Sequence, residues 1–322
     1  MGYYKYLFGP VPSRRLGRSL GVDLTPHKTC SLDCVFCQLG RTTEKTVARQ
    51  EYAPTDKVLA ELAEWLDRDG QADYITLSGS GEPTLHSGFG KVLEFIRLKT
   101  VIPAVLLTNG TMLQLPEVRE AAAYANIVKV SLSAWNQASY ELVNRPHNKL
   151  RFDQLVKGQI DFRAQFRGEL WMEVFLIAGM NSLPTDVGKI AEHAKKIGPD
   201  RIQLNTVVRP PAEDFAAALS EESMQALTLL FNPPAEIISE FKAAHNSNIK
   251  ANQATILSML QRRPCSAQQI ADIFGMHLNE VSKYLGNLMH KNQIRSERKN
   301  KTVYYAATGN KIGELHRRNP CA

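Results

Sequence analysis

Short apolar runs alternate with helical patterns over residues 1 to about 210, and this alternation limits the fold more than any other feature. An apolar run of about four to eight residues bounded by turn residues is typical of a buried strand. Six such runs, separated by helical segments such as 55–68 and 184–197, predict an α/β fold built on a partial parallel (β/α)6 barrel. The predicted strands are 20–24, 74–78, 105–108, 127–133, 170–177 and 202–206.

Three cysteines lie together in one loop, with the spacing C-x3-C-x2-C at Cys30, Cys34 and Cys37. Thiolates hold iron–sulfur clusters, and a four-iron cluster with three protein ligands keeps one iron open for a small molecule. Two other uses of these residues remain open. His27 with the three cysteines has the donor set of a closed zinc site, and Cys34 with Cys37 has the spacing of a redox thiol pair.

Two polar turns follow the second and third predicted strands. The segment 78–84 reads S-G-S-G-E-P-T, in which Gly79 and Gly81 let the backbone approach a ligand and Glu82 can accept from an ammonium group. Asn109 follows the next strand, and its amide can hydrogen-bond a ribose or a substrate. Because the active sites of parallel barrels lie at the carboxyl ends of the strands, we expect the cysteine loop, Glu82 and Asn109 to meet there.

In this chain order the motifs resemble the signature of the radical S-adenosylmethionine (radical SAM) superfamily, including the aromatic Phe36 before the last cysteine. The resemblance implies a [4Fe–4S] cluster on the three cysteines, with S-adenosylmethionine bound at the open iron. It also implies an electron donor such as flavodoxin or ferredoxin. Such an enzyme cleaves S-adenosylmethionine to a 5′-deoxyadenosyl radical, which abstracts hydrogen from a substrate.

The segments F-G-P-V-P-S-R-R-L-G at 8–17, Q-L-G at 38–40 and S-G-S-G-E at 78–82 resemble a subgroup related to the enzymes that form the wyosine base of tRNA. The resemblance covers the barrel. Wyosine-forming enzymes carry additional cysteines ahead of the radical loop, whereas here no cysteine precedes Cys30. Wyosine formation itself is therefore not implied.

Strand alternation predicts which side chains point into the barrel. In 127–133 the polar residues occupy one face of the strand, and the valines and Leu132 occupy the other. We expect the apolar face to pack on helices and the polar face to point into the barrel. The last two predicted strands add further polar residues to this interior. We expect cofactor contacts from Phe36, Gly79, Gly81, Glu82, Asn109, Ser131, Ser133 and Asn205, and substrate contacts from Lys129, Glu173, Arg201 and Arg209. Two alternatives stay open: Lys129 and Glu173 as a buried structural pair, and Arg201 at the solvated bottom of the barrel.

The excess positive charge is concentrated at the end of the chain. Residues 250–322 carry 12 Lys and Arg against 4 Asp and Glu, so the rest of a chain of formal charge +7 is close to neutral. The 322 residues suggest more than one domain, and no apolar stretch reaches membrane-spanning length. Five cysteines, three of them in one loop, give no disulfide framework, so we expect a cytoplasmic protein.

The chain after the barrel divides into three parts. Helices are predicted at 220–231, capped by Ser220, and at 235–244, followed by a linker at 245–248. The segment 250–308 resembles a winged helix-turn-helix domain, with helices 253–261, 266–274 and 277–291 and a hairpin of 294–297 with 303–306. We therefore expect a barrel at 1–210, a helical extension and linker at 211–249, the winged domain at 250–308 and a tail at 309–322.

Nucleic acid is one expected partner of the winged domain. Winged domains that bind nucleic acid typically place the long helix in a major groove and the basic wing against the phosphates. The candidate contacts are Asn279, Lys283, Asn287, Arg298, Lys299 and Lys301. Three hypotheses follow. The leading one is radical chemistry on a nucleic-acid base in RNA, delivered by the winged domain. The second is modification of a peptide or protein held by the winged domain. The third is a non-enzymatic iron–sulfur transcription regulator.

Overall fold

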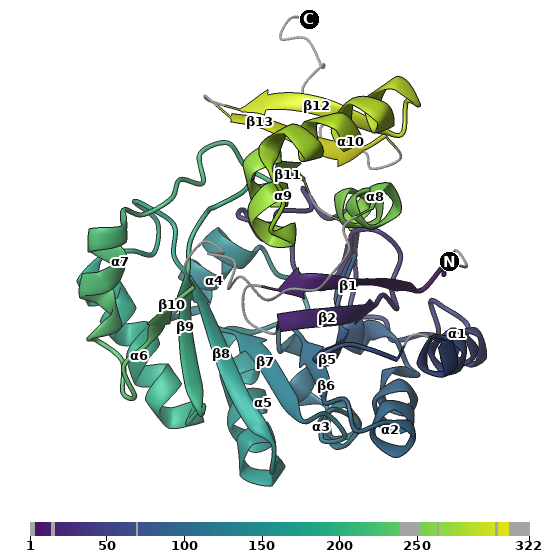
Figure 1. Cartoon of the computed structure of the whole chain (residues 1–322). Coiled ribbons are helices and arrows are strands. Elements are labelled where there is room, and N and C mark those ends of the chain that lie inside the picture. Colours follow the sequence, from purple (N-terminus) through teal and green to yellow (C-terminus); the bar gives the residue numbers. More distant parts are fainter. Residues whose placement is uncertain are drawn as a thin grey trace, which may run out of the picture.

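A partial barrel of six parallel strands forms the centre of the molecule (Figure 1). The computed structural model describes residues 4–13, 17–68, 70–238, 252–262, 264–299 and 302–308. The six strands occur where the sequence predicts them: β2 (Gly17–Val22), β5 (Tyr74–Leu77), β6 (Ala104–Leu107), β7 (Ile127–Ser131), β8 (Glu169–Phe175) and β9 (Arg201–Asn205). At the two edges of the sheet, β1 (Leu7–Ser13) runs antiparallel to β2 and β10 (Glu236–Ile237) runs parallel to β9.

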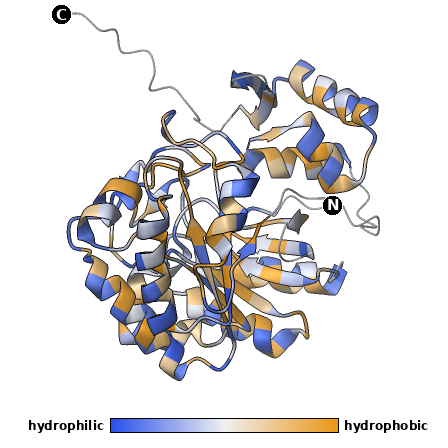
Figure 2. Ribbon diagram, turned by 90° about the vertical axis from the view of Figure 1, so that its left-hand side faces the viewer, coloured by the Kyte–Doolittle hydropathy of each residue, from blue (hydrophilic) through white to orange (hydrophobic). Residues whose placement is uncertain are grey.

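Helices cover the outer face of this sheet because each presents an apolar stripe to it (Figure 2). In α1 (Thr55–Arg68) the buried residues Val58, Leu62 and Trp65 recur at helical spacing. Both α1 and α6 (Pro184–Ile197) have the predicted bounds. The other helices before residue 239 are α2 (Phe89–Lys99), α3 (Pro116–Ala122), α4 (Gln137–Asn144), α5 (Phe152–Gln165) and α7 (Glu221–Thr228), with short turns η1 (Pro83–Leu85) and η2 (Thr111–Gln114).

The interior of the barrel has two layers, and the prediction of a polar interior is correct for one of them only. Val105, Ile127 and Trp171 form a small buried apolar cluster of their own at the amino ends of the strands. Nearer the carboxyl ends, Lys129 pairs with Glu173. The polar layer therefore lies on the side on which a barrel active site forms.

The segment after α7 corrects one prediction. Ser220 caps α7 as expected, because its side chain accepts from the backbone N–H of Ser223 at 3.2 Å. The helix predicted at 235–244 instead begins as strand β10, and Ile238 N donates to Leu204 O at 2.9 Å. Pairing with β9 satisfies backbone groups at the sheet edge that a helix would leave open. Residues 239–244 and the predicted linker lie outside the described residues.

Residues 252–308 form a small C-terminal module with its own core. Its elements are α8 (Gln253–Arg262), β11 (Cys265–Ser266), α9 (Ala267–Phe274), α10 (Leu278–His290), β12 (Ile294–Lys299) and β13 (Thr302–Ala307). The three strands form an antiparallel sheet in the order β11-β13-β12. As predicted, Ser266 caps α9 and Gly275 ends it, here with a positive φ of 62°.

The C-terminal module touches both ends of the barrel sheet. Val11 of β1 packs against the core of the module, and Gln269 of α9 donates from Nε2 to the carbonyl oxygen of Val208, just after β9, at 3.3 Å. Figure 1 shows the module lying across β1 and the loop that follows β9. Among the described residues, no helix combines the length and apolar character needed to cross a membrane.

Candidate active site

The cysteine loop, residues 30–37, lies at the carboxyl ends of the strands and is held there by backbone hydrogen bonds. It begins in β3 (Thr29–Cys30), which pairs with β4 (Glu44–Lys45). Asp33 N donates to Asn144 O at 3.0 Å, and Val35 N donates to Val143 O at 3.1 Å, so the end of α4 fixes the middle of the loop.

Each of the three sulfurs accepts a hydrogen bond from a different nitrogen. Lys28 Nζ donates to Cys37 Sγ at 3.1 Å and Asn144 Nδ2 to Cys34 Sγ at 3.3 Å. Asn109 Nδ2 lies 3.6 Å from Cys30 Sγ. Donors of this kind around thiolate ligands stabilise iron–sulfur clusters and tune their potential. The donor set therefore fits a cluster held by these cysteines.

The thiols are costly to ionise unless a cation compensates them. Burial raises the pKa of Cys30 to about 12, and the nearby Glu82 carboxylate adds to the shift. Burial likewise raises the pKa of Cys34, and the other two cysteines raise it further. Thiolates at this place therefore require positive charge, which iron supplies.

The geometry does not favour the zinc alternative. Among the described residues, no group of three or more His, Cys, Asp and Glu side chains converges on a position for one metal ion. A four-iron cluster makes no such demand, because each cysteine binds a different iron. His27, the fourth ligand of the zinc hypothesis, is exposed.

Glu82 is buried, and its carboxylate already serves as an internal acceptor. Its Oε1 accepts from Thr84 N at 3.1 Å, from Thr84 Oγ1 at 2.6 Å and from Thr108 Oγ1 at 2.6 Å. Its Oε2 accepts from Asn109 N at 2.7 Å. Glu82 thus joins the turn after β5 to the turn after β6, a role that sequence reasoning did not assign to it.

The glycines of the turn after β5 are required by close packing within the protein. A Cβ on Gly81 would lie 1.9 Å from Thr29 O, next to Cys30, and a Cβ on Gly79 would lie 2.4 Å from the Asp23 carboxylate. Glu82 N also donates to Thr29 O at 3.1 Å. The turn and the start of the cysteine loop are therefore in direct backbone contact, and any side chain at residue 81 would separate them.

The remaining expected cofactor residues lie around the same end of the barrel. Asn109 Oδ1 accepts from Thr111 N and Oγ1, while its Nδ2 donates to Ser31 Oγ at 2.9 Å. Ser131 and Ser133 line a cavity of about 10 Å³ together with Asn109. Phe36 stacks on Phe175 at the end of β8, with ring centroids 4.0 Å apart and planes inclined by 9°.

The four substrate-side candidates are not all in one place. Lys129, which is buried, forms an ion pair with the partly buried Glu173, and Asn205 Nδ2 donates to Glu173 Oε1 at 3.4 Å. Arg209 is buried and donates to Gln38 Oε1 at 2.8 Å, one residue beyond Cys37. Arg201 is the first residue of β9, is half exposed, and lies over Trp171, so it occupies the bottom of the barrel. The expectation that Arg201 faces the substrate is therefore wrong, and the alternative position is the observed one.

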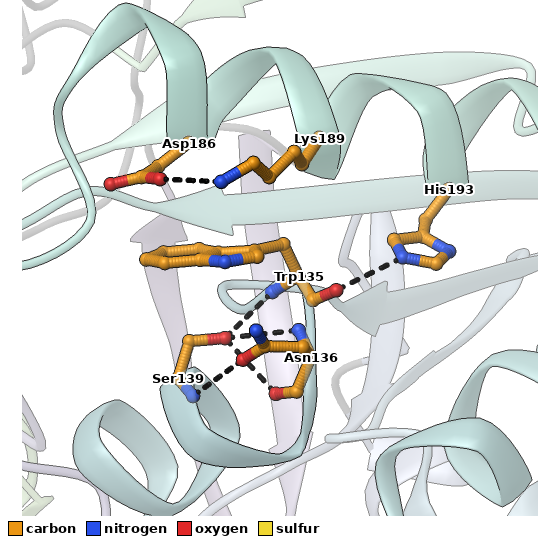
Figure 3. A network of polar contacts seen from close by, with 6 residues as sticks. All are labelled: Trp135, Asn136, Ser139, Asp186, Lys189 and His193. Carbon is orange, nitrogen blue, oxygen red and sulfur yellow. Dashed lines mark hydrogen bonds and ion pairs between the residues drawn. The ribbon is translucent and has the colours of Figure 1, made fainter.

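A polar network fixes the start of α4, the helix that carries Asn144 (Figure 3). Asn136 and Ser139 form a reciprocal capping box, in which Ser139 N donates to Asn136 Oδ1 at 2.8 Å. On α6, His193 Nε2 donates to Trp135 O at 3.1 Å, and Lys189 lies 5.5 Å from the Trp135 ring centre. The network thus ties α4 to α6. Asn144 is separated from Cys34 by 110 residues, so sequence spacing gave no signal for this contact.

The segment after β9 crosses the cysteine loop and is fastened to it by charge. Glu213 N donates to Val35 O at 3.0 Å, and its carboxylate pairs with Arg41 and Arg145. Burial alone would raise the pKa of Glu213, but the two arginines hold it below its ordinary value. We call residues 206–219 the strap. No spacing in the sequence indicates it.

Comparison with known proteins agrees with this geometry. The family model of the radical SAM superfamily matches residues 24–158. A structure of TYW1 with a lysine-pyruvate adduct bound has a TM-score of 0.50 and 19% identity, covering 73% of this chain and 78% of that one. A radical SAM methyltransferase from Sphaerobacter thermophilus has a TM-score of 0.51 and 17% identity, covering 68% and 65%. The protein is therefore a radical SAM enzyme that uses a [4Fe–4S] cluster and S-adenosylmethionine.

Relatives that match along most of the chain identify a family within the radical SAM enzymes. A UPF0026 protein of Methanocaldococcus jannaschii is 30% identical over 317 residues, 91% of this chain and 98% of that protein. A protein of Brachyspira hyodysenteriae named GTPase Obg is 36% identical over 306 residues, which span 94% of this chain but only 45% of that protein. The chain belongs to the UPF0026 family.

Proposed function

We propose that Cys30, Cys34 and Cys37 each bind one iron of the [4Fe–4S] cluster and leave the fourth iron to S-adenosylmethionine. When bound, the cluster would supply the electron for reductive cleavage of S-adenosylmethionine, and the residues of the site would hold the reactants and exclude water. The observation that carries the proposal is the set of three nitrogen donors, one to each sulfur, from Lys28, Asn109 and Asn144. An electron donor such as flavodoxin or ferredoxin would first have to reduce the cluster.

Anaerobic reconstitution tests this assignment. The whole protein should take up about four irons and four sulfides, and each single Cys→Ala change in the loop should abolish both the cluster and cleavage of S-adenosylmethionine. Cys265→Ala is the control, because Cys265 is buried in the separate core of the C-terminal module. Full iron content in a loop variant would contradict the assignment.

The cofactor pocket in this proposal has two kinds of residue. Phe36, Ser131, Ser133 and Asn205 contact S-adenosylmethionine, and the backbone at Gly79 and Gly81 contributes to the same pocket. Glu82 and Asn109 belong to the same pocket, and in addition they hold the turns after β5 and β6 together. Lys129, Glu173 and Arg209 face the substrate. Gln203 Oε1 is buried in this polar layer without a hydrogen-bond partner among the described residues, which suits a polar ligand.

We further propose that the C-terminal module is a winged helix-turn-helix domain that brings a nucleic-acid substrate, an RNA base, to the barrel. Asn279, Lys283 and Asn287 are exposed on α10, and Arg298 is exposed near the end of β12. The side chain of Lys299 and residue Lys301 lie outside the described part of the structure. The domain boundaries proposed are 1–210, 211–249, 250–308 and 309–322.

A pocket between the two parts supports an anionic substrate. Its volume is about 870 Å³, within the range of ligand sites. The barrel contributes Lys5, His27 and Lys57 and also the Asp23 carboxylate, which accepts from Ser80, and the module contributes Asn292 and Gln293. Cations and amide donors are the groups that contact phosphates.

Salt dependence of RNA binding by the whole protein tests this part. Replacing Arg298, Lys299 and Lys301 with Gln should weaken binding and reduce the slope of log K against log salt by about 0.7 for each lost contact with a single strand. A triple change of exposed lysines on the barrel, Lys91, Lys99 and Lys157, is the control. Capture of a peptide without RNA would favour the second hypothesis, and duplex DNA binding without cofactor cleavage would favour a regulator.

A further inference from the structure

Lys28 is a buried cation with an unusual backbone conformation. Its side chain is 4% exposed, and its φ of 61° lies in the left-handed region that non-glycine residues seldom adopt. Such a conformation is unfavourable and persists only where the surroundings impose it. Here the backbone is held on both sides, because Lys28 N donates to Ser80 O at 2.6 Å and Lys28 O accepts from Thr43 N and Glu44 N at 3.2 Å.

The consequence of this conformation is the contact between Lys28 Nζ and Cys37 Sγ at 3.1 Å. Within the part of the chain that the structure describes, no carboxylate forms an ion pair with Lys28. A buried ammonium is costly unless an anion faces it. The sulfur of Cys37, a thiolate when it binds iron, is the group that faces this ammonium.

We propose that Lys28 is a positioning residue that raises the reduction potential of the cluster. This inference rests on the proposed function, since it requires the cluster on Cys37. One electron from a low-potential donor converts the oxidised cluster to a reduced form with one more negative charge. A cation 3.1 Å from a ligating sulfur stabilises the reduced form more than the oxidised form. Net charge and hydrogen bonds to sulfur are established determinants of cluster potential.

The test is a potentiometric titration of the whole, anaerobically reconstituted protein, with the reduced cluster measured by electron paramagnetic resonance. Lys28→Met should lower the ratio of reduced to oxidised cluster at a fixed potential at least tenfold, about 59 mV for a one-electron couple. Lys28→Arg keeps the charge and should change the ratio much less. Lys45→Met is the matched control, because Lys45 is an exposed lysine near the same loop that bonds to Arg145 O and not to sulfur.

Each outcome decides the matter. A loaded Lys28→Met protein whose ratio falls less than tenfold overturns the proposal. If Lys28→Met does not take up iron, Lys28→Gln replaces it in the titration with the same expected shift. Iron loss from both neutral variants but not from Lys28→Arg supports the requirement for charge, whereas loss from all three overturns the proposal. Absence of a cluster in the unaltered protein would instead contradict the proposed function.

Discussion

At the scale of single residues, the site is built from side chains that hold loops against one another. Glu82 is the clearest case, because four donors from two turns meet on one buried carboxylate. Its motif was recognisable from the sequence, but its partners were not. Thr108 and Asn109 are 26 and 27 residues away along the chain, and only the parallel pairing of β5 with β6 brings them to it.

Glu82→Gln therefore tests a structural role. A glutamine side chain has an NH2 group in place of one carboxylate oxygen. This NH2 group would face at least one of the N–H or O–H donors that now bond to Glu82, and that buried donor would lose its acceptor. We expect a loss of about 1–3 kcal/mol in the free energy of unfolding of the cluster-free protein, measured in urea. If stability is unchanged while affinity for S-adenosylmethionine falls, Glu82 acts by direct contact with the cofactor.

Gly81→Ala tests the contact between the turn and the cysteine loop. The new methyl group meets a backbone oxygen that cannot rotate away, so we expect destabilisation of about 1–3 kcal/mol and poorer iron uptake. Gly188→Ala is the control, since nothing lies within 4 Å of a Cβ at that position in α6. That change should stabilise the helix by about 0.5–1 kcal/mol. Equal effects of the two changes would refute the packing argument.

At the scale of elements, the six barrel strands and the helices of the C-terminal module were predictable from periodicity, because each buries one continuous apolar face. β1 was not, since Pro10 and Pro12 make its sequence unlike a strand. Prolines are tolerated there because β1 is an edge strand. β10 has only two residues, too few for any pattern. The apolar half of the interior was missed because alternation alone does not say where along a strand the polar layer begins.

The N-terminal cap of α4 stabilises the helix whose last residue, Asn144, donates a hydrogen bond to Cys34. Asn136→Ala should remove about 1 kcal/mol of stability and loosen the end of the helix that carries Asn144. Iron release to a chelator should then be faster. Ser220→Ala removes a comparable cap from α7, which packs on β10 and, in the described part of the chain, forms no hydrogen bond with the cysteine loop; it should cost similar stability without changing iron release. Identical release from both variants would show that α4 does not support the cluster.

At the scale of the whole molecule, the strap joins the end of the barrel to its first loop through Glu213. Because the pKa of Glu213 is lowered in the folded protein, its contribution is complete above the ordinary carboxyl pKa of 4.5 and is lost as pH falls through the lowered value. Glu213→Gln should therefore cost about 1–3 kcal/mol near neutral pH, and the difference from the unaltered protein should shrink below pH 4.5.

Urea unfolding at a series of pH values measures this difference. Glu192→Gln provides the comparison, since Glu192 is exposed on α6. It should change stability little at any pH. A Glu213 difference that stays constant down to pH 3 would show that the ion pairs do not stabilise the strap.

The contact of the C-terminal module with both ends of the sheet also has a consequence for biosynthesis. Val208 and Thr308 are 100 residues apart, which at ribosomal speed takes about 5–20 s to translate. The cysteine loop and all six parallel strands therefore leave the ribosome well before the segment that lies across the sheet edges. During this interval the module does not yet lie across β1 and the loop that follows β9, so we expect loading of the three cysteines with iron and sulfide to be able to begin before the module is in place.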